Sequence, residues 1–294
     1  MSFRNDRVSL FGIAALVVFA GAASFSAVCA EDFATDVPDR VWIDLGGGAN
    51  TVGTNVSFIG AKGVGAAVNF EDVFDLPGNK TTFRILGTVR ISEKRRYIDF
   101  GYVNIDRSGS TVLDQEIKIG DYTIQGGGTV GARFATQFIY SAFRYDFLHE
   151  EKVRISGSAG LTFIRLTTSF NGNGSYYLPE DNPDLPPPNS GDFGKEGSAG
   201  APVPMVGLNL DWALTKRLVV RSYNRFFRLN LSSFNGGLYE SGVRLNWYFV
   251  KNFGLGLGLD RTDLKIKELK VGDGNVLKAD YSITGIGLYA NLAF

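Results

Sequence analysis

Apolar and polar residues alternate one by one through most of this chain, and this period of two restricts its fold more than any other feature. In residues 206–214, for example, Val206, Leu208 and Leu210 are separated by glycine or polar residues. Successive side chains of a strand point to opposite faces, so each segment has one apolar and one polar face. A one-residue shift would exchange the faces, and the pattern therefore predicts register as well as strand position.

The alternation recurs often enough to predict ten strands, with bounds good to about two to four residues. Eight strands would result if one predicted hairpin did not form, and twelve would result if 58–74 formed a hairpin of its own. The predicted strands are 40–50, 81–92, 97–106, 129–148, 153–170, 203–214, 218–231, 238–250, 253–271 and 278–294.

The connections between these strands are of two alternating kinds. The short charged ones are 93–96, 149–152, 215–217 and 251–252. The longer Gly-rich ones are 50–80, 107–128, 171–204, 232–237 and 272–275. Short turns at one end and long loops at the other are typical of membrane barrels. The predicted fold class is therefore all-β, a transmembrane antiparallel up-and-down β-barrel of about ten strands.

Composition fits such a barrel better than a bundle of membrane helices. Hydrophobic residues make up only 44% of the 294, whereas each membrane helix needs about 20 consecutive apolar residues. Barrel strands need apolar residues only on the face toward lipid. The chain has 30 basic and 30 acidic residues, and the lack of a basic excess argues against nucleic acid as a partner. A soluble all-β protein is also compatible with composition alone.

The N-terminus has the layout of a secretory signal peptide. Arg4 and Arg7 precede an apolar stretch at 10–20, and small residues lead up to Ala30. We predict a cleaved signal peptide at 1–30 and a barrel domain at 31–294. Cleavage would remove Cys29, the one cysteine of the chain, and exclude disulfides and thiolate chemistry. An uncleaved N-terminal anchor and a lipoprotein acylated at Cys29 are the weaker alternatives.

The last predicted strand resembles the C-terminal targeting strand of Gram-negative outer-membrane β-barrel proteins. One of its faces is apolar and ends on the final aromatic residue: Ile286, Leu288, Ala290, Leu292 and Phe294. The resemblance implies an outer-membrane location, and the even number of predicted strands leaves both termini on the periplasmic side. It also implies contact with outer-membrane lipid and lipopolysaccharide, and recognition by the barrel-insertion machinery. Tyr289 and Phe294 are the residues that we assign to this assembly signal.

The predicted register turns a set of charged residues toward the interior. In the favoured interpretation they pair and fill a narrow lumen. In the other, an arginine-lined channel admits small solutes and favours anions, and the inward glycines Gly254, Gly256 and Gly258 count for a cavity. The inward residues are Arg84, Arg90, Arg154, Arg221, Arg225, Arg244, Asp44, Asp99, Asp211, Glu240 and Asp260.

The single histidine argues against an enzyme. Barrel enzymes, as families, rely on a histidine near the outer rim, whereas His149 falls in a predicted periplasmic turn and is expected to be solvated. With one histidine and no mature cysteine, we predict no zinc site and no cofactor. The loop at 171–204 contains prolines that disfavour strand pairing, and it is expected to lie outside the cell.

The function predicted from sequence is that of a non-catalytic envelope protein, structural or binding through its extracellular loops. A narrow pore for small solutes is the alternative. An outer-membrane enzyme acting on lipid A or peptides is the most distant one.

Overall fold

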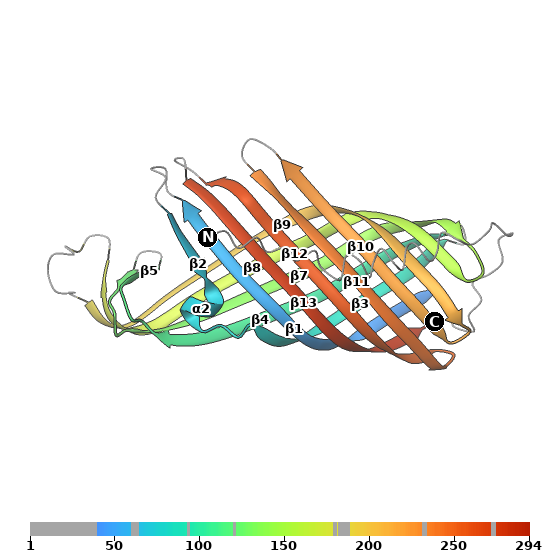
Figure 1. Cartoon of the computed structure of the whole chain (residues 1–294), viewed down its shortest axis with the longest axis horizontal. Helices are drawn as coiled ribbons and strands as arrows, with labels where there is room; N and C mark the ends of the chain where they lie inside the picture. Colours follow the sequence, from blue (N-terminus) through green and yellow to red (C-terminus); the bar gives the residue numbers. More distant parts are fainter. Residues whose placement is uncertain are drawn as a thin grey trace, which may run out of the picture.

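Ten long antiparallel strands form the wall of a barrel in the computed structural model of the chain (Figure 1). The structure describes residues 40–59, 65–92, 95–119, 122–178, 181, 189–230, 234–271 and 275–294. The expected signal peptide at 1–30 lies outside these residues. The wall strands are β1 (Val41–Ile59), β3 (Asn79–Ser92), β4 (Arg96–Val112), β7 (Thr129–His149), β8 (Val153–Tyr177), β9 (Asn189–Thr215), β10 (Leu218–Asn230), β11 (Phe234–Val250), β12 (Phe253–Val271) and β13 (Asn275–Ala293).

Each wall strand pairs with its two neighbours along the chain, and the last pairs with the first. The closing register of β1 and β13 runs from Trp42 opposite Ala293 to Ile59 opposite Val276. At the seam the backbone N–H of Phe294 also donates to the carbonyl of Val41 over 2.9 Å. Closure leaves no free edge among the wall strands at membrane level, as the bilayer requires. The predicted ten-strand barrel is confirmed, and neither eight nor twelve wall strands are formed.

Burial follows the sequence alternation along the strands. On β11, Leu238, Arg244 and Tyr248 are buried, whereas Leu245 and Trp247 between them are exposed. The exposed side chains of neighbouring strands continue this apolar surface, for example Leu255, Leu257 and Leu259 on β12 and Ile286 and Leu288 on β13. The apolar face is therefore the lipid face and the polar face lines the interior. In the described part of the chain, no helix has both the length and the apolar character to cross a bilayer.

Several wall strands extend further than predicted on the extracellular side. β1 continues to Ile59, β4 to Val112 and β8 to Tyr177, while β9 already begins at Asn189. Much of the expected loop at 171–204 is thus a paired ribbon, from Asn171 opposite Gly194 to Tyr176 opposite Asn189. The prediction of an irregular loop was wrong for these flanks, because glycine-rich strands lack the apolar alternation that marks a membrane-facing segment. The prolines at 179, 183 and 186–188 lie outside the described residues.

The connection between β1 and β3 contains a short strand and a short helix that sequence reasoning missed. β2 (Gly65–Asn69) pairs with the outer end of β1, and α2 (Phe70–Phe74) follows it directly. The Asn69 side chain caps α2 by accepting from the Asp72 N–H over 3.0 Å. β5 (Ile117–Ile119) and β6 (Tyr122–Ile124) form another small hairpin. In Figure 1, α2, β2 and β5 lie toward one end of the barrel and the C-terminus toward the other.

Candidate functional site: the barrel interior

The charged residues predicted to face inward lie in the lower, periplasmic half of the barrel interior. Apart from Arg90 at the rim, Arg221 is the most exposed of these residues, with 13% of its side chain accessible. Arg90 stands opposite Tyr97 near the periplasmic rim and is half-buried. The others are at most 8% exposed: Asp44, Arg84, Asp99, Arg154, Asp211, Arg225, Glu240, Arg244 and Asp260.

Asp260 of β12 is the central acceptor of one group of these residues. One of its carboxylate oxygens accepts from Arg244 at 2.7 Å and from the Tyr223 hydroxyl at 2.8 Å. The other oxygen accepts from the Tyr289 hydroxyl at 2.7 Å and lies 3.1 Å from an Arg84 nitrogen. A single buried carboxylate thus joins residues of β3, β10, β11 and β13, and pairing of this kind is what makes a buried charge tolerable.

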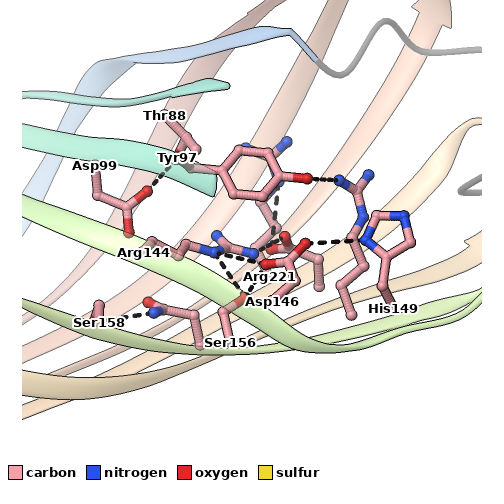
Figure 2. Close-up of polar contacts among 12 residues, drawn as sticks. Thr88, Tyr97, Asp99, Arg144, Asp146, His149, Ser156, Ser158 and Arg221 are labelled. Atoms are coloured by element: carbon pink, nitrogen blue, oxygen red, sulfur yellow. Dashed lines mark hydrogen bonds and ion pairs between the residues drawn. The ribbon is translucent and has the colours of Figure 1, made fainter. Parts of the chain in front are cut away.

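A second group surrounds Arg144 near the periplasmic end of β7, and Figure 2 shows its contacts. Arg144 of β7 forms an ion pair with Asp211 and lies 3.5 Å from Asp146. Its Nε donates to Ser156 over 2.8 Å, and the Ser156 hydroxyl donates to Asp146 over 2.5 Å. Each of these groups has a partner on another strand, so the cluster ties β7, β8 and β9 together.

Aromatic rings fill the space between the arginines. The Arg221 guanidinium lies 3.6 Å from the centre of the Trp42 ring. The Arg225 guanidinium lies 3.7 Å from the Tyr140 ring and 4.2 Å from the Tyr223 ring, and its NH1 is 3.6 Å from Glu240. Cation–π contacts of this kind stabilise a desolvated guanidinium. They also occupy the cross-section that an arginine-lined channel would need.

The inward glycines of β12 do not open a cavity. A Cβ atom on Gly258 would lie 2.8 Å from the Tyr289 ring, and one on Gly256 would lie 2.6 Å from Asn246. Neighbouring side chains therefore occupy the space above these glycines, which corrects their interpretation as a sign of a hollow lumen. The polar cavity between the two charged groups measures only about 70 Å³. A space of this size holds a few water molecules at most.

The extracellular half of the interior contains a large cluster of buried apolar side chains. Phe134, Phe138, Met205, Leu238 and Ile283 are among its buried members, drawn from β7, β9, β11 and β13. The short helix α2 packs against this cluster, and the cluster therefore includes residues that lie outside the ten predicted strands.

Two phenylalanines of α2 anchor it against the wall. The Phe70 ring lies 5.4 Å from the Phe134 ring, and the Phe74 ring lies 5.2 Å from the Phe170 ring. On β4, a Cβ at Gly109 would come within 2.4 Å of the Phe74 carbonyl, so glycine is required where the helix end meets this strand.

One ion pair connects α2 to β4 inside the barrel. Arg107 of β4 is fully buried and pairs with Glu71 of α2, whose side chain is 16% exposed. Arg107 also donates to the Thr54 hydroxyl, and the Thr54 N–H donates to Glu71 over 3.0 Å. The sequence analysis placed Arg107 at the start of a loop. The alternation of β4 could have identified it, because Arg107 continues the inward face on which Val103 and Ile105 lie.

His149 is not the solvated turn residue that was expected. It ends β7, with 14% of its side chain exposed, and its Nδ1 lies 3.1 Å from Asp146 (Figure 2). The register shifts between Asp146 and Leu148, and this bulge turns His149 inward. Ser156 contacts the other oxygen of Asp146 rather than the imidazole. Among the described residues there is no cluster of metal-ligating side chains.

Tyr289 and Phe294, the assigned assembly residues, face in opposite directions. Phe294 is 55% exposed on the outer surface, whereas Tyr289 is buried and donates to Asp260. Arg144 and Asp146 were missed as interior residues, although both continue the even-numbered inward face of β7.

No family model matches the sequence, and no curated protein matches it. Among solved structures, the outer membrane protease OmpT of Escherichia coli superposes with a TM-score of 0.52 at 12% identity, covering 87% of this chain and 97% of OmpT. The protein has the fold of a Gram-negative outer-membrane β-barrel. The outer membrane protein OprG of Pseudomonas aeruginosa also matches, with a TM-score of 0.35 at 11% identity over 90% of this chain and 100% of OprG. The apolar outer face of this closed barrel fits an outer-membrane location.

Proposed function

We propose that this outer-membrane barrel is non-catalytic and non-conducting, and that it acts in the envelope through its extracellular surface. The observation that carries the proposal is the filled interior. Paired charges and stacked rings occupy the periplasmic half, and an apolar cluster with α2 occupies the extracellular half. A solute would have to displace both layers to cross.

The extracellular part of the barrel offers a surface for binding. β8 and β9 stay paired up to Tyr176 opposite Asn189, whereas the pairing of β9 with β10 ends at Val206 opposite Phe226. β7 accompanies β8 as far as Thr129 opposite Asn173, so the β7–β9 side of the wall extends beyond the point where β9 separates from β10. Surface ribbons and loops carried on a rigid scaffold are where binding proteins place variable contacts.

An enzyme is disfavoured by the position of the one histidine. His149 lies at the periplasmic end, half-buried beside Asp146, and the Ser156 hydroxyl contacts Asp146 rather than the imidazole ring. A serine that uses a histidine as its general base must hydrogen-bond the imidazole directly, and Ser156 does not. The fold likeness to a protease therefore carries no argument for catalysis at this histidine.

The experiment that tests the proposal is conductance of the protein purified from outer membranes and inserted into a planar bilayer. We expect no discrete current steps from protein whose folding is verified by its heat-dependent gel mobility, with a general porin as the positive control. Reproducible steps of one size would contradict the proposal and favour a narrow channel. Ion selectivity lost on Arg225→Gln would then assign the lining.

A further inference from the structure

The outer wall of the barrel changes from apolar to charged over a short distance on β12. Leu255, Leu257 and Leu259 are exposed to lipid, and the next outward positions are Arg261 and Asp263. Beside them, Phe226 is 54% and Tyr239 37% exposed. Exposed aromatic residues at the edge of an apolar band mark the membrane–water boundary of barrels. The extracellular ends of β10–β12 thus cross the level of the lipid headgroups.

A hollow lies in the wall at this level. It measures about 390 Å³, and we name it the basic groove for its lining by Phe226, Arg228, Gly237, Tyr239, Lys265 and Lys267. Gly237 stands between Arg228 on β10 and Lys265 on β12 in the strand register. A Cβ at Gly237 would lie 2.7 Å from the Phe227 carbonyl, so this glycine both permits the close approach of β10 and leaves the floor of the groove empty.

The groove has more positive charge than its own carboxylates neutralise. Asp263 is held by Arg261 of the same strand, at 2.6 Å and 3.1 Å. Lys265 lies 3.8 Å from Asp280, and both side chains are more than half exposed. Arg228 and Lys267 form no ion pair with any described residue. Three cations and one carboxylate thus line the groove, and with the adjacent partners Arg261 and Asp280 four cations face two carboxylates. A phosphate group, with about −1.5 to −2 charges, would neutralise this excess.

We propose that the basic groove binds the phosphate of a phosphorylated, acylated glycolipid of the outer leaflet. An arginine and a lysine flanking an empty position suit a phosphate, since the guanidinium donates in pairs and the ammonium adds a point charge. Phe226 and Tyr239 beneath them offer rings to the sugar, and the leucines of β12 lie where the acyl chains would descend. This site does not depend on whether the barrel conducts.

The test is a titration of the detergent-solubilised protein with bis-phosphorylated lipid A, and with lipid A from which both phosphates have been removed. We expect the double variant Arg228→Gln, Lys265→Gln to bind the phosphorylated lipid about tenfold more weakly or worse. The milder variant Lys267→Gln should show a smaller loss. All these side chains are exposed, and heat-dependent gel mobility verifies that each variant is folded.

The matched control removes two exposed arginines from the wall formed by β7 and β8, through Arg133→Gln and Arg165→Gln, and should bind like wild type. Equal binding by wild type and the Arg228, Lys265 variant would overturn the proposal. So would an equal loss in the control, or equal affinity for lipid without phosphate. Displacement of lipid A by an equal amount of inorganic phosphate would assign the groove to a free anion and overturn the lipid assignment.

Discussion

At the scale of single residues, the barrel interior is stabilised by carboxylates that each serve several strands. Taking a charge out of water costs several kcal/mol, and it is offset only where geometry and hydrogen bonds are good. Asp260 meets this condition with two arginines and two tyrosine hydroxyls. At the closing seam, Asp44 of β1 accepts a hydrogen bond from Asn291 of β13 over 2.7 Å.

Replacing the central carboxylate should therefore be costly. We expect Asp260→Asn to lower the free energy of unfolding by about 3–5 kcal/mol, because Arg84 and Arg244 would remain buried without their counter-charge. Urea titration of the protein in lipid vesicles, followed by tryptophan fluorescence, measures the change. The control Asp280→Asn removes an exposed carboxylate and should change stability by less than about 1 kcal/mol. Equal effects of the two would refute the role of Asp260.

The ion pair beneath α2 gives a second prediction. Glu71→Gln leaves the fully buried Arg107 without its carboxylate, and we expect a loss of about 3 kcal/mol or more. Asp72→Asn on the same helix is the matched control, since Asp72 is exposed. Faster proteolysis of the 60–78 segment in Glu71→Gln, with the wall strands intact, would locate the effect in α2. A variant as stable as Asp72→Asn would contradict this assignment.

At the scale of elements, β13 serves both closure and the predicted assembly signal. It pairs with β12 on one side and β1 on the other, and its two faces are divided between Phe294 outside and Tyr289 inside. The barrel-insertion machinery would recognise the signal before the barrel has closed, so the signal must consist of residues whose role does not require the folded interior. The outward Phe294 meets this condition better than Tyr289.

Deleting Phe294 and changing Tyr289→Phe should therefore have different effects. The deletion is expected to reduce the folded protein in the outer-membrane fraction several-fold, while refolding of purified protein into detergent remains. Tyr289→Phe should assemble normally and lose about 1 kcal/mol of stability with its hydrogen bond to Asp260. Fractionation and heat-dependent gel mobility distinguish the two. Normal assembly of the deletion variant would remove Phe294 from the signal.

At the scale of the whole molecule, the two layers of the interior block the lumen in series. The apolar cluster with α2 lies above the charged groups, so opening one layer leaves the other in place. We therefore expect changes in both layers together to affect conductance far more than the sum of the changes made separately.

We predict that deletion of residues 66–74 alone, and the pair Arg221→Ala, Arg225→Ala alone, both remain silent in planar bilayers. The combined variant should give discrete current steps, because both layers are then thinned. Current from either single change would show that the remaining layer does not block the lumen. Silence of a folded combined variant would show that the wall side chains alone close it.

The sequence by itself determined the wall of this protein. Alternation in a strand is local, and a slip of one residue would expose Arg84 or Asp260 to lipid, so strand number, register and inward charges could be predicted. Only the tertiary structure decided how the interior is filled. These contacts depend on which side chains meet across the barrel. Examples are the stacking of Arg225 on Tyr140, the Tyr289 ring over Gly258, and the ion pair of Glu71 with Arg107. Those distances are set by barrel closure, and no local pattern encodes them.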